Sequence, residues 1–472
     1  MMADGPRDLR SFLLEHRAAT WHLPAGLDTR YDLTALQHAL DRQRHFPILR
    51  AERMLTADGG TARLAVITNL TASRKLCARA LGVGDHREMA AWYATRSAAG
   101  IAPRIVARDS APVQQHVMQG AQADLRVLPV LTQHELEPGP YLTAAHATTY
   151  DPDSLVDNTA IQRCWVQAAQ RMSWFPYPSS HNARNLAKFW RRDEACPVAF
   201  WIGHHPAVLM GTQAKLRYPE SHWMAAGGVL GEPLRLVPSI THGERIMVPA
   251  DAEIVIEGWA QPNQLAPDGP FGEYTGYLGP AVQAPICEVT CISMREDALY
   301  HDYGSGLTDM LVPDNLAMEG KLFQLAKAVA PSLRNVHVPT AGRRFHARLQ
   351  LEQPSRGEAR DALTAALAYR RTKLALAVDT DVDIFDDESV EWAVATRVQW
   401  SRDSFVIDAL SGSSLDPSLD AGENTASKIA IDATRAVPTR ANAPPVATAP
   451  AQNAARANAY LARADSAAWP RA

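Results

Sequence analysis

Two acidic residues flank a turn in the segment Asp268-Gly-Pro-Phe-Gly-Glu-Tyr-Thr-Gly-Tyr277. Its glycines and proline fix an unusual backbone path, along which the main chain can approach a ligand closely. Tyr274 and Tyr277 add flat apolar surface with a polar tip. The residues alone allow two interpretations: a loop that presents Asp268 and Glu273 to a pocket as an acid/base pair, or a tight surface turn with two solvated acids.

The composition limits the classes of protein that can carry this loop. The chain has 472 residues, which at about 150 residues per domain suggests roughly three domains. The 47 basic and 51 acidic residues give a net charge of −4, so binding of nucleic acid by bulk electrostatics is excluded. A hydrophobic fraction of 46% supports a sizeable core and excludes disorder over most of the chain.

Five cysteines in a chain of this length do not form a disulfide framework. Cys287 and Cys291 alternate with Val289 in a strand-like run, which favours a buried strand face over a metal pair. The N-terminal residues contain no apolar signal segment, and no run of about 18 apolar residues occurs. We therefore expect a reduced, cytoplasmic enzyme.

The pattern of apolar residues predicts two α/β regions on either side of a region of short strands. Before residue 116, the helices and strands are expected at 31–44, 46–49, 64–67 and 89–98. Further along, short alternating runs separated by Gly, Pro and Asp favour a β-barrel or sandwich, interrupted by one helix at 181–190. The strands expected there lie at 125–128, 198–202, 253–257 and 286–294.

From residue 314 the chain again alternates between helix and strand patterns, which predicts an α/β domain. Asp314 is expected to cap the first helix of that domain. The later elements are expected at 358–370, 374–378, 386–395 and 405–410. The segment 441–472 has 14 alanines and 4 prolines, and either a helix at 453–468 docked on a neighbour or a frayed tail fits it.

The segment from Asp268 to Tyr277 closely resembles the signature of the UbiD family of reversible decarboxylases, which use a prenylated flavin. The family's usual form begins with Glu, whereas this chain has Asp268. Other stretches that resemble the family lie at 139–143, 150–153, 158–163, 180–184, 248–258, 379–385, 390–393 and 428–434. The resemblance covers about residues 30 to 434 and leaves the tail unexplained.

This resemblance implies an α/β plus β-barrel architecture. The domains expected are an N-terminal α/β domain at 1–115, a split β-barrel that binds prenylated FMN at 116–312, a C-terminal α/β dimerisation domain at 313–440 and the tail at 441–472. A separate flavin prenyltransferase would supply the cofactor, and the chain would form a homodimer or homohexamer. The substrate would be an aromatic, heteroaromatic or α,β-unsaturated carboxylic acid, with no nucleic acid or membrane as partner.

Loss of CO2 from an unsaturated carbon needs an electron sink that side chains do not supply, and the resemblance implies prenylated FMN in that role. The family's acid–Arg–acid catalytic set corresponds here to Asp268, Arg163 and Glu273. Glu273 is expected to be the proton donor. Arg163 is expected to orient the substrate carboxylate.

The family also holds the flavin phosphate through a divalent cation, usually Mn2+, with K+ possible nearby. The matching ligands are Asn158 and His181, and the family's Glu position falls on His222, with Glu220 two residues away as an alternative. Ile161 and Lys373 are expected to contact the cofactor together with Asn158, Arg163 and His181. His222 departs from the family pattern, which has Glu at this position. Hard cations prefer oxygen ligands, although histidine can bind manganese.

Two other classes of function remain open at this stage. Because of Asp268 and His222, the chain could be a UbiD-like binding or assembly protein with altered or lost turnover. The two carboxylates alone also allow a hydrolase such as a glycosidase, although their position on one short loop beside an arginine disfavours it. Leu307, Met310 and Leu311 are expected to line the substrate pocket or to pack in the core.

Overall fold

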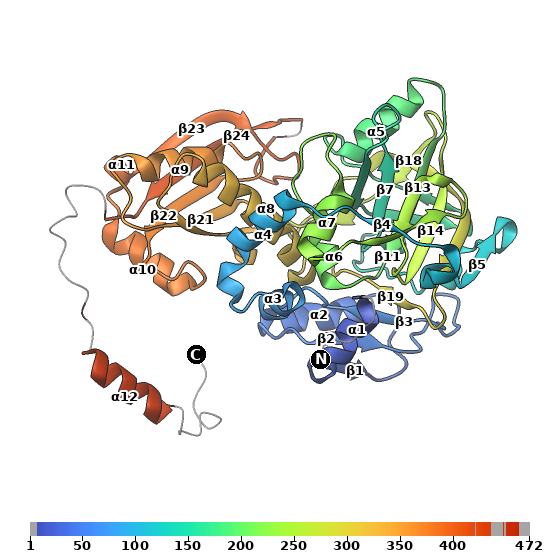
Figure 1. The fold of residues 1–472 in the computed structure, drawn as a ribbon, viewed down its shortest axis with the longest axis horizontal. Helices are drawn as coiled ribbons and strands as arrows, with labels where there is room; N and C mark the ends of the chain where they lie inside the picture. The colour runs from blue at the N-terminus through green and yellow to red at the C-terminus, as the bar shows by residue number, and fades with distance from the viewer. Residues whose placement is uncertain (1–6, 421, 436–446, 448–449, 462–472) are drawn as a thin grey trace.

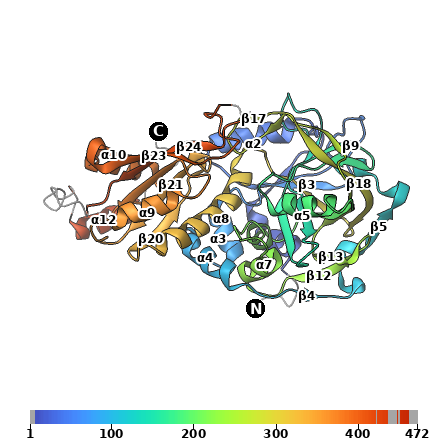
Figure 2. The same ribbon diagram turned by 90° about the horizontal axis from the view of Figure 1, so that it is seen from above.

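The computed structural model describes residues 7–420, 422–435, 447 and 450–461 (Figure 1). The larger body contains the N-terminal and central parts of the chain, and the C-terminal α/β unit stands beside it (Figure 1, Figure 2). The long helix α8 (Thr308–Lys327) lies at the junction between them. None of the helices in the described ranges is both long enough and apolar enough to cross a membrane.

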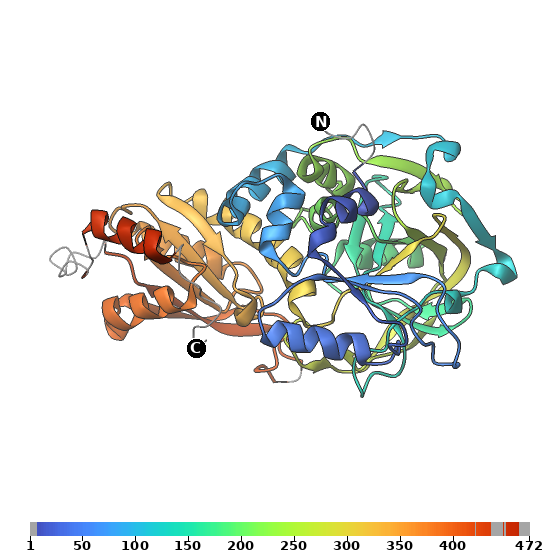
Figure 3. The same cartoon turned by 90° about the horizontal axis from the view of Figure 1, so that it is seen from below.

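The first unit is a four-stranded sheet in the order β1-β2-β3-β19. Its strands are β1 (Thr20–Leu23), β2 (Ile48–Ala51), β3 (Ala65–Thr68) and β19 (Leu299–His301). Its helices are α1 (Leu9–Glu15), α2 (Asp32–Arg42), α3 (Arg74–Leu81) and α4 (Met89–Ala99). The helices and strands predicted before residue 116 are confirmed, and the blue N-terminal helices face the viewer in Figure 3. Strand β19, labelled beside β3 in Figure 1, adds a strand from a distant part of the chain.

A ten-stranded antiparallel sheet curls into half a barrel and forms the central unit (Figure 1). Its strands are β5 (His116–Gln119), β6 (Tyr141–Leu142), β7 (His146–Tyr150), β8 (Asp157–Ile161), β9 (Cys164–Ala168), β10 (Arg171–Ser173), β11 (Cys196–Ile202), β14 (Ile254–Ala260), β15 (Leu265–Asp268) and β18 (Val282–Met294). The long strand β18 pairs with four others, which bends the sheet around it. The barrel-like region expected from the sequence is thereby confirmed.

Shorter elements complete the central unit. The helices are α5 (His181–Trp190), α6 (Pro206–Gly211) and α7 (His222–Leu230). The remaining strands are β4 (Arg104–Ile105), β12 (Arg235–Ser239), β13 (Gly243–Pro249), β16 (Phe271–Gly272) and β17 (Leu278–Gly279). Helix α5 has the predicted bounds, because Ser180 accepts a hydrogen bond from the Ala183 amide and fixes its start.

The C-terminal unit is a five-stranded sheet in the order β20-β21-β22-β24-β23. Its elements are β20 (Leu333–His337), β21 (His346–Leu351), α9 (Glu358–Leu367), β22 (Leu374–Asp379), α10 (Asp387–Arg397), α11 (Trp400–Asp403), β23 (Ser404–Ser411) and β24 (Thr425–Asp432). Helix α12 (Ala451–Leu461) is exposed along its length and stands away from the sheet in Figure 1. The rest of the segment 441–472 lies outside the described residues, except 447 and 450. The predicted domain boundaries at 115 and 312 stay predictions.

Two predictions about local structure are wrong. Helix α8 begins at Thr308, so Asp314 lies inside it and does not cap it. Pro313 has no amide hydrogen for the Asp309 carbonyl four residues back, and Thr71 Oγ1 donates to that carbonyl instead (2.8 Å). The strand expected at 125–128 is a 3₁₀ turn, because the Asp124 side chain accepts from the Arg126 amide and favours the turn.

The apolar core is shared between units. One cluster joins the first sheet to the inner face of the half-barrel around Trp174 and Phe200. Another fills the space between α8, α9 and the C-terminal sheet around Leu363. All five cysteines are buried and free, and Cys287 and Cys291 lie on β18 as core residues, as the alternation predicts.

Candidate active site

The two acids of the glycine-rich segment converge on one arginine. Arg163 follows β8, Asp268 ends β15 and Glu273 follows β16. The Nε and Nη2 atoms of Arg163 both lie 2.7 Å from Asp268 Oδ2, and its Nη1 donates to Glu273 Oε1 at 2.5 Å. Ser173 Oγ donates to the other oxygen of Asp268 (2.8 Å). The structure therefore brings together the three residues expected to form the catalytic set.

Aromatic rings hold the Arg163 guanidinium in place. Its Cζ lies 4.5 Å from the ring centre of Phe175 and 4.9 Å from that of Phe271, within the range of a cation–π contact. The Arg163 side chain is only 7% exposed, so its charge is poorly hydrated. A fixed and poorly hydrated guanidinium is well suited to bind a carboxylate through two parallel hydrogen bonds.

Asp268 lies behind Arg163 in a fully buried position. The next residue, Gly269, has a φ of +93°, which glycine adopts without the strain that a side chain would cause. The Gly269 amide donates to the hydroxyl of Tyr141 (2.8 Å), and this bond anchors the start of the loop. The loop therefore holds Asp268 against the arginine on the side away from the cavity.

Glu273 has the environment of a proton donor. Burial raises its pKa and the charge of Asp268 raises it further, while Arg163 and Arg344 act in the opposite direction. An acid with a raised pKa keeps its proton to higher pH and can donate it during a reaction. Gly279 leaves room for this side chain, because a Cβ there would lie 3.0 Å from Glu273 Cγ.

Arg163 and Glu273 line a cavity of about 610 Å³ between the half-barrel and the C-terminal unit. The other expected residues on its wall are Asn158, Ile161, His181, His222 and Met310. Among the residues expected to hold the cofactor or the metal, Lys373 and Glu220 are not on the wall. The Lys373 ammonium lies 2.7 Å from the Asp416 carboxylate, and Glu220 accepts from the Arg217 amide (3.0 Å).

Two histidines face each other across part of this wall. The rings of His181 and His222 are 5.9 Å apart between centres. Burial lowers the pKa of His222 to about 3, and its Nδ1 has no hydrogen-bond partner. A neutral imidazole with a free nitrogen is the form that binds a metal ion.

Asn158 adds an amide to this end of the cavity. Its Nδ2 donates to Asn182 Oδ1 (2.6 Å), which leaves its oxygen for another partner. Across the described ranges, the structure contains no group of three or more His, Cys, Asp or Glu side chains placed to hold a metal ion. A cation here would therefore rely on the two histidines, the Asn158 amide and oxygens of a bound ligand.

Sequence reasoning missed a cluster of charges around Asp314 on the same wall. Lys215, Arg344 and Arg371 all pair with its carboxylate, Arg344 at 3.1 Å and Arg371 at 2.6 Å. Although burial alone would raise it, these three cations hold the pKa of Asp314 well below its usual range. Three cations against one acid leave excess positive charge at the cavity, which suits an anionic ligand group such as a phosphate.

Glu273 also lines a second cavity, of about 360 Å³, on its other side. Besides Glu273, the charged or titratable residues on that wall are His38, Asp41, Arg42, Arg44, His134, Tyr277 and Arg343, and the expected Leu307 and Leu311 lie there too. His134 Nδ1 lies 2.8 Å from Glu137 Oε1, and the ring packs directly on Gly272, beside Glu273. Glu273 thus stands between two cavities, both rich in positive charge.

Comparison with known proteins identifies the family. Residues 104–307 match UbiD, described as the 3-octaprenyl-4-hydroxybenzoate carboxy-lyase Rift-related domain, and residues 315–433 match the corresponding C-terminal domain. The chain therefore belongs to the UbiD family, and it is a carboxy-lyase. The resemblance and the architecture expected from the sequence are confirmed.

Individual relatives agree with this assignment. An anhydromevalonate phosphate decarboxylase of Methanothermobacter thermautotrophicus is 30% identical over 318 residues, 67% of this chain and 74% of that protein. The UbiD-class enzyme HmfF of Pelotomaculum thermopropionicum, solved in complex with FMN, is 33% identical with a TM-score of 0.88 over 96% of this chain and 100% of that one. An evolved dimeric form of HmfF, solved in complex with prFMN, is 32% identical with a TM-score of 0.84 over 95% and 98%.

Proposed function

We propose that this chain reversibly decarboxylates an aromatic, heteroaromatic or α,β-unsaturated carboxylic acid, with prenylated FMN bound in the cavity of about 610 Å³. The observation that carries the proposal is the Arg163 bridge between Asp268 and Glu273 on the wall of that cavity. The HmfF structures, which hold FMN and prFMN, support the choice of cofactor. When bound, the prenylated flavin supplies the electron sink that loss of CO2 from an unsaturated carbon needs.

In this proposal Arg163 binds and orients the substrate carboxylate. The substrate carboxylate is then the third carboxylate beside Arg163, after those of Asp268 and Glu273. Its negative charge favours the protonated form of Glu273. Once CO2 has left, the Glu273 carboxyl donates its proton to the carbon that carried the CO2. In the reverse direction the Glu273 carboxylate removes that proton, because the same group must serve both directions of one step.

Asp268 replaces the glutamate of the usual family signature, and its geometry supports turnover. The shorter side chain still reaches Arg163 at 2.7 Å because the loop holds it beside Nε, and Ser173 completes its hydrogen bonding. We infer that Asp268 fixes the orientation of Arg163 and sets the charge that Glu273 experiences. This contact argues against the alternative of a binding protein that has lost turnover.

The residues of the cavity fit the proposed cofactor. Lys215, Arg344 and Arg371 leave excess positive charge on the wall, which suits the flavin phosphate. His181, His222 and the Asn158 oxygen would hold Mn2+ or another divalent cation, with phosphate oxygens as the harder ligands that such a cation prefers. Ile161 would pack on the cofactor, and K+ would bind as a second cation at the same end of the cavity. Lys373 is the weaker candidate, since it pairs with Asp416.

Two chemical classes of substrate acid fit the structure. They differ in whether the substrate would use the second cavity. An aromatic acid would fill the apolar part of the larger cavity beside Met310. The relative named for anhydromevalonate phosphate instead points to an acid with a phosphate group. The positive wall of the second cavity, with Arg42, Arg44 and Arg343, would accept such a group next to Glu273.

The test uses the full chain co-expressed with a flavin prenyltransferase, the partner that we propose as cofactor supplier. We expect a bound flavin with an absorption band distinct from that of free FMN, and CO2 exchange with at least one acid in a panel of aromatic, heteroaromatic and phosphate-bearing unsaturated acids. Purified protein without flavin would contradict the choice of cofactor. Flavin-loaded Glu273→Gln that exchanges substrate hydrogen for deuterium at full rate would contradict the proton-donor role.

Metal content provides a second readout that does not depend on activity. We expect manganese in the loaded wild-type protein and its loss in His222→Ala, while the exposed control His116→Ala keeps it. Equal metal content in both variants would remove His222 from the proposed ligands. We also propose a homodimer or homohexamer, for which the exposed Val406 on the edge strand β23 offers an apolar contact.

A further inference from the structure

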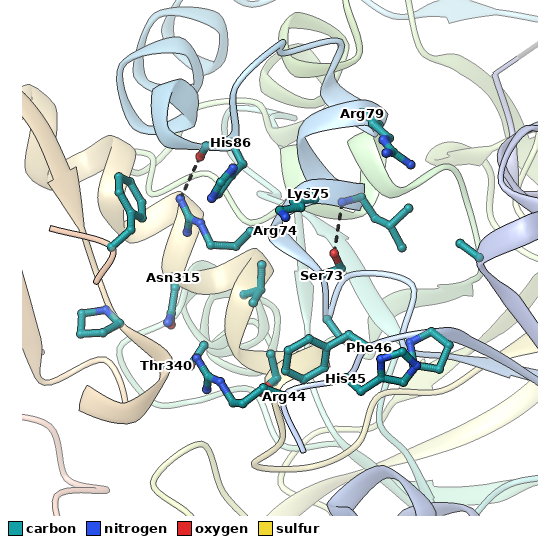
Figure 4. A pocket seen from close by; sticks show the side chains of 18 of the residues that line it. Arg44, His45, Phe46, Ser73, Arg74, Lys75, Arg79, His86, Asn315 and Thr340 are labelled. Atoms are coloured by element: carbon teal, nitrogen blue, oxygen red, sulfur yellow. Dashed lines mark hydrogen bonds between the residues drawn. The ribbon is translucent and has the colours of Figure 1, made fainter. Parts of the chain in front are cut away.

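A third cavity, of about 840 Å³, lies outside the proposed active site (Figure 4). Its walls come from the first unit, from the N-terminal turn of α3, from α8 and from the loop 337–341. Neither Arg163 nor Glu273 lines it. It borders the second cavity, with which it shares Arg44, Thr308, Thr340 and Ala341. This space is therefore a separate one that adjoins the route to Glu273.

Cations without partners surround this cavity. No Asp or Glu carboxylate in the described part of the chain lies within ion-pair distance of Arg44, Lys75 or Arg79. Arg74, by contrast, makes two hydrogen bonds to Glu319 at 2.9 and 3.0 Å. Figure 4 shows Arg74 and Lys75 on one side of the cavity and Arg44 on the other, so positive groups face each other across it. The acid on the wall, Asp387, pairs with Arg348 (2.6 Å).

The start of α3 strengthens this positive character. Ser73 caps the eight-residue helix, and its first turn holds Arg74 and Lys75 but no acidic residue. The N-terminus of a helix carries partial positive charge, so cations there are unfavourable unless a negative group lies nearby. Glu319 offsets Arg74, but no described group offsets Lys75. A bound anion at this helix end would offset it.

The floor of the cavity adds a polar group and a ring. Asn315 on α8 is 1% exposed, and while its Nδ2 donates to the Val338 carbonyl (3.0 Å), its Oδ1 has no hydrogen-bond partner. A buried acceptor without a partner is costly, which points to a donor on a ligand. Phe46 presents its ring beside Arg44 on the same wall (Figure 4). The lining thus offers cations, one unpaired acceptor and aromatic surface together.

We propose that this cavity binds a small organic phosphate that carries a ring, the chemical class of a mononucleotide. Its phosphate lies between Arg44 and Lys75 at the start of α3, its ring packs on Phe46, and a hydroxyl or amino group donates to Asn315 Oδ1. The ligand bridges the first unit, α8 and the loop 337–341, so it holds the C-terminal unit against the larger body. The site shares Arg44 with the second cavity, but neither Arg163 nor Glu273 lines it, so its occupation does not require the decarboxylation proposed above.

Calorimetry and thermal unfolding of the full-length protein test the proposal, with AMP, inorganic phosphate and pyrophosphate as probes. We expect AMP to bind and to raise the Tm of the wild-type protein. Lys75→Ala combined with Arg79→Ala should weaken AMP at least tenfold, whereas the charge-matched control Arg17→Ala with Arg63→Ala should not. Lys75→Ala alone should raise the Tm of the ligand-free protein, because it removes a cation from a positive helix end.

Further variants separate the two parts of the ligand. Phe46→Ala should weaken AMP more than pyrophosphate, since pyrophosphate has no ring to pack on it. The proposal is overturned if neither AMP nor pyrophosphate binds at millimolar concentration. It is also overturned if the Lys75/Arg79 variant binds AMP as tightly as the wild type, or if the Arg17/Arg63 control loses as much affinity. The last result would show that general charge attraction accounts for the binding.

Discussion

Glu273 and Asp268 share one arginine, and this sharing governs which of them carries a proton. Arg163 contacts both carboxylates, but two of its nitrogens lie against Asp268, which also accepts a hydrogen bond from Ser173. Asp268 is therefore the better stabilised anion, and its charge raises the pKa of Glu273. The proposed role of Glu273 as proton donor is consistent with this asymmetry of contacts.

Asp268→Asn should reduce decarboxylation by an order of magnitude or more. The amide keeps the size of the side chain but removes the charge, so the Glu273 pKa falls and less of the acid is protonated at a given pH. Each tenfold loss in kcat corresponds to about 1.4 kcal/mol of activation free energy. The measurement is the pH profile of kcat, whose limb for the protonated Glu273 should move to lower pH.

Ser173→Ala provides the matched control for this prediction. It removes one neutral hydrogen bond from Asp268 and leaves the charge, so kcat should fall less and the pH profile should keep its position. A profile that is the same in Asp268→Asn and the wild type would contradict the role assigned to Asp268.

At the scale of elements, α8 carries an acid that joins three separate segments. Asp314 on α8 pairs with Lys215 before α7, with Arg344 before β21 and with Arg371 before β22. All four side chains lie on the cavity wall between the half-barrel and the C-terminal unit. The cluster therefore ties these parts together and, at the same time, creates the excess positive charge proposed to bind the flavin phosphate.

Asp314→Asn should destabilise the flavin-free protein by about 3–5 kcal/mol, the usual cost of breaking a buried ion pair on one side. The loss should be smaller in flavin-loaded protein, because the phosphate then offsets the cations. Denaturant unfolding of both forms measures the difference. The control Asp153→Asn, an exposed acid paired with Lys188 and Arg192, should cost much less, because exposed ion pairs are well screened by solvent. Equal losses in the free and loaded forms would contradict a shared role with the phosphate.

The sequence predicted most of the elements and the trio of Asp268, Arg163 and Glu273 that meets in the structure, but not this cluster. Local signals suffice where a motif is contiguous: the loop from Asp268 to Tyr277 carries two members of the trio, and Ser180 marks the start of α5. Lys215, Arg344 and Arg371 come from three distant segments, and spacing along the chain does not reveal that they meet. Asp314 was also misleading: it was expected to cap a helix, but α8 begins at Thr308 and continues through Pro313.

At the scale of the whole molecule, buried histidines lie where the first sheet meets the half-barrel. His301 is on β19 in the first sheet, His146 is on β7 and His204 follows β11. Burial lowers the pKa of each to about 3, and the charges of His301 and His204 also act on His146. The joint between the two units is therefore built from histidines that fold in their neutral form.

The low pKa values of these histidines make the free energy of unfolding depend on pH. The sign follows from which state, folded or unfolded, binds more protons. The unfolded histidine has a pKa of about 6.5 and the folded His301 of about 3, so below pH 6.5 the unfolded state binds more protons. Each such histidine therefore lowers the free energy of unfolding as the pH falls from 6.5 toward 3. Asp157, Asp251 and Asp309, whose pKa values burial raises to about 6, act in the opposite sense between about pH 4 and 6.

A variant of one histidine isolates its share from these opposing groups. Neither ring nitrogen of His301 has a hydrogen-bond partner, and Tyr303 packs 4.6 Å from the ring, so His301→Leu removes the titration without breaking a hydrogen bond. Relative to the wild type, this variant should gain about 2 kcal/mol of stability between pH 7.5 and pH 5, whatever its stability at pH 7.5. Urea unfolding at both pH values measures the gain. The control Ile292→Val changes the same core without removing a titrating group, so its difference in stability from the wild type should be the same at both pH values. If the difference for His301→Leu is also independent of pH, the assignment of a neutral His301 to this joint is contradicted.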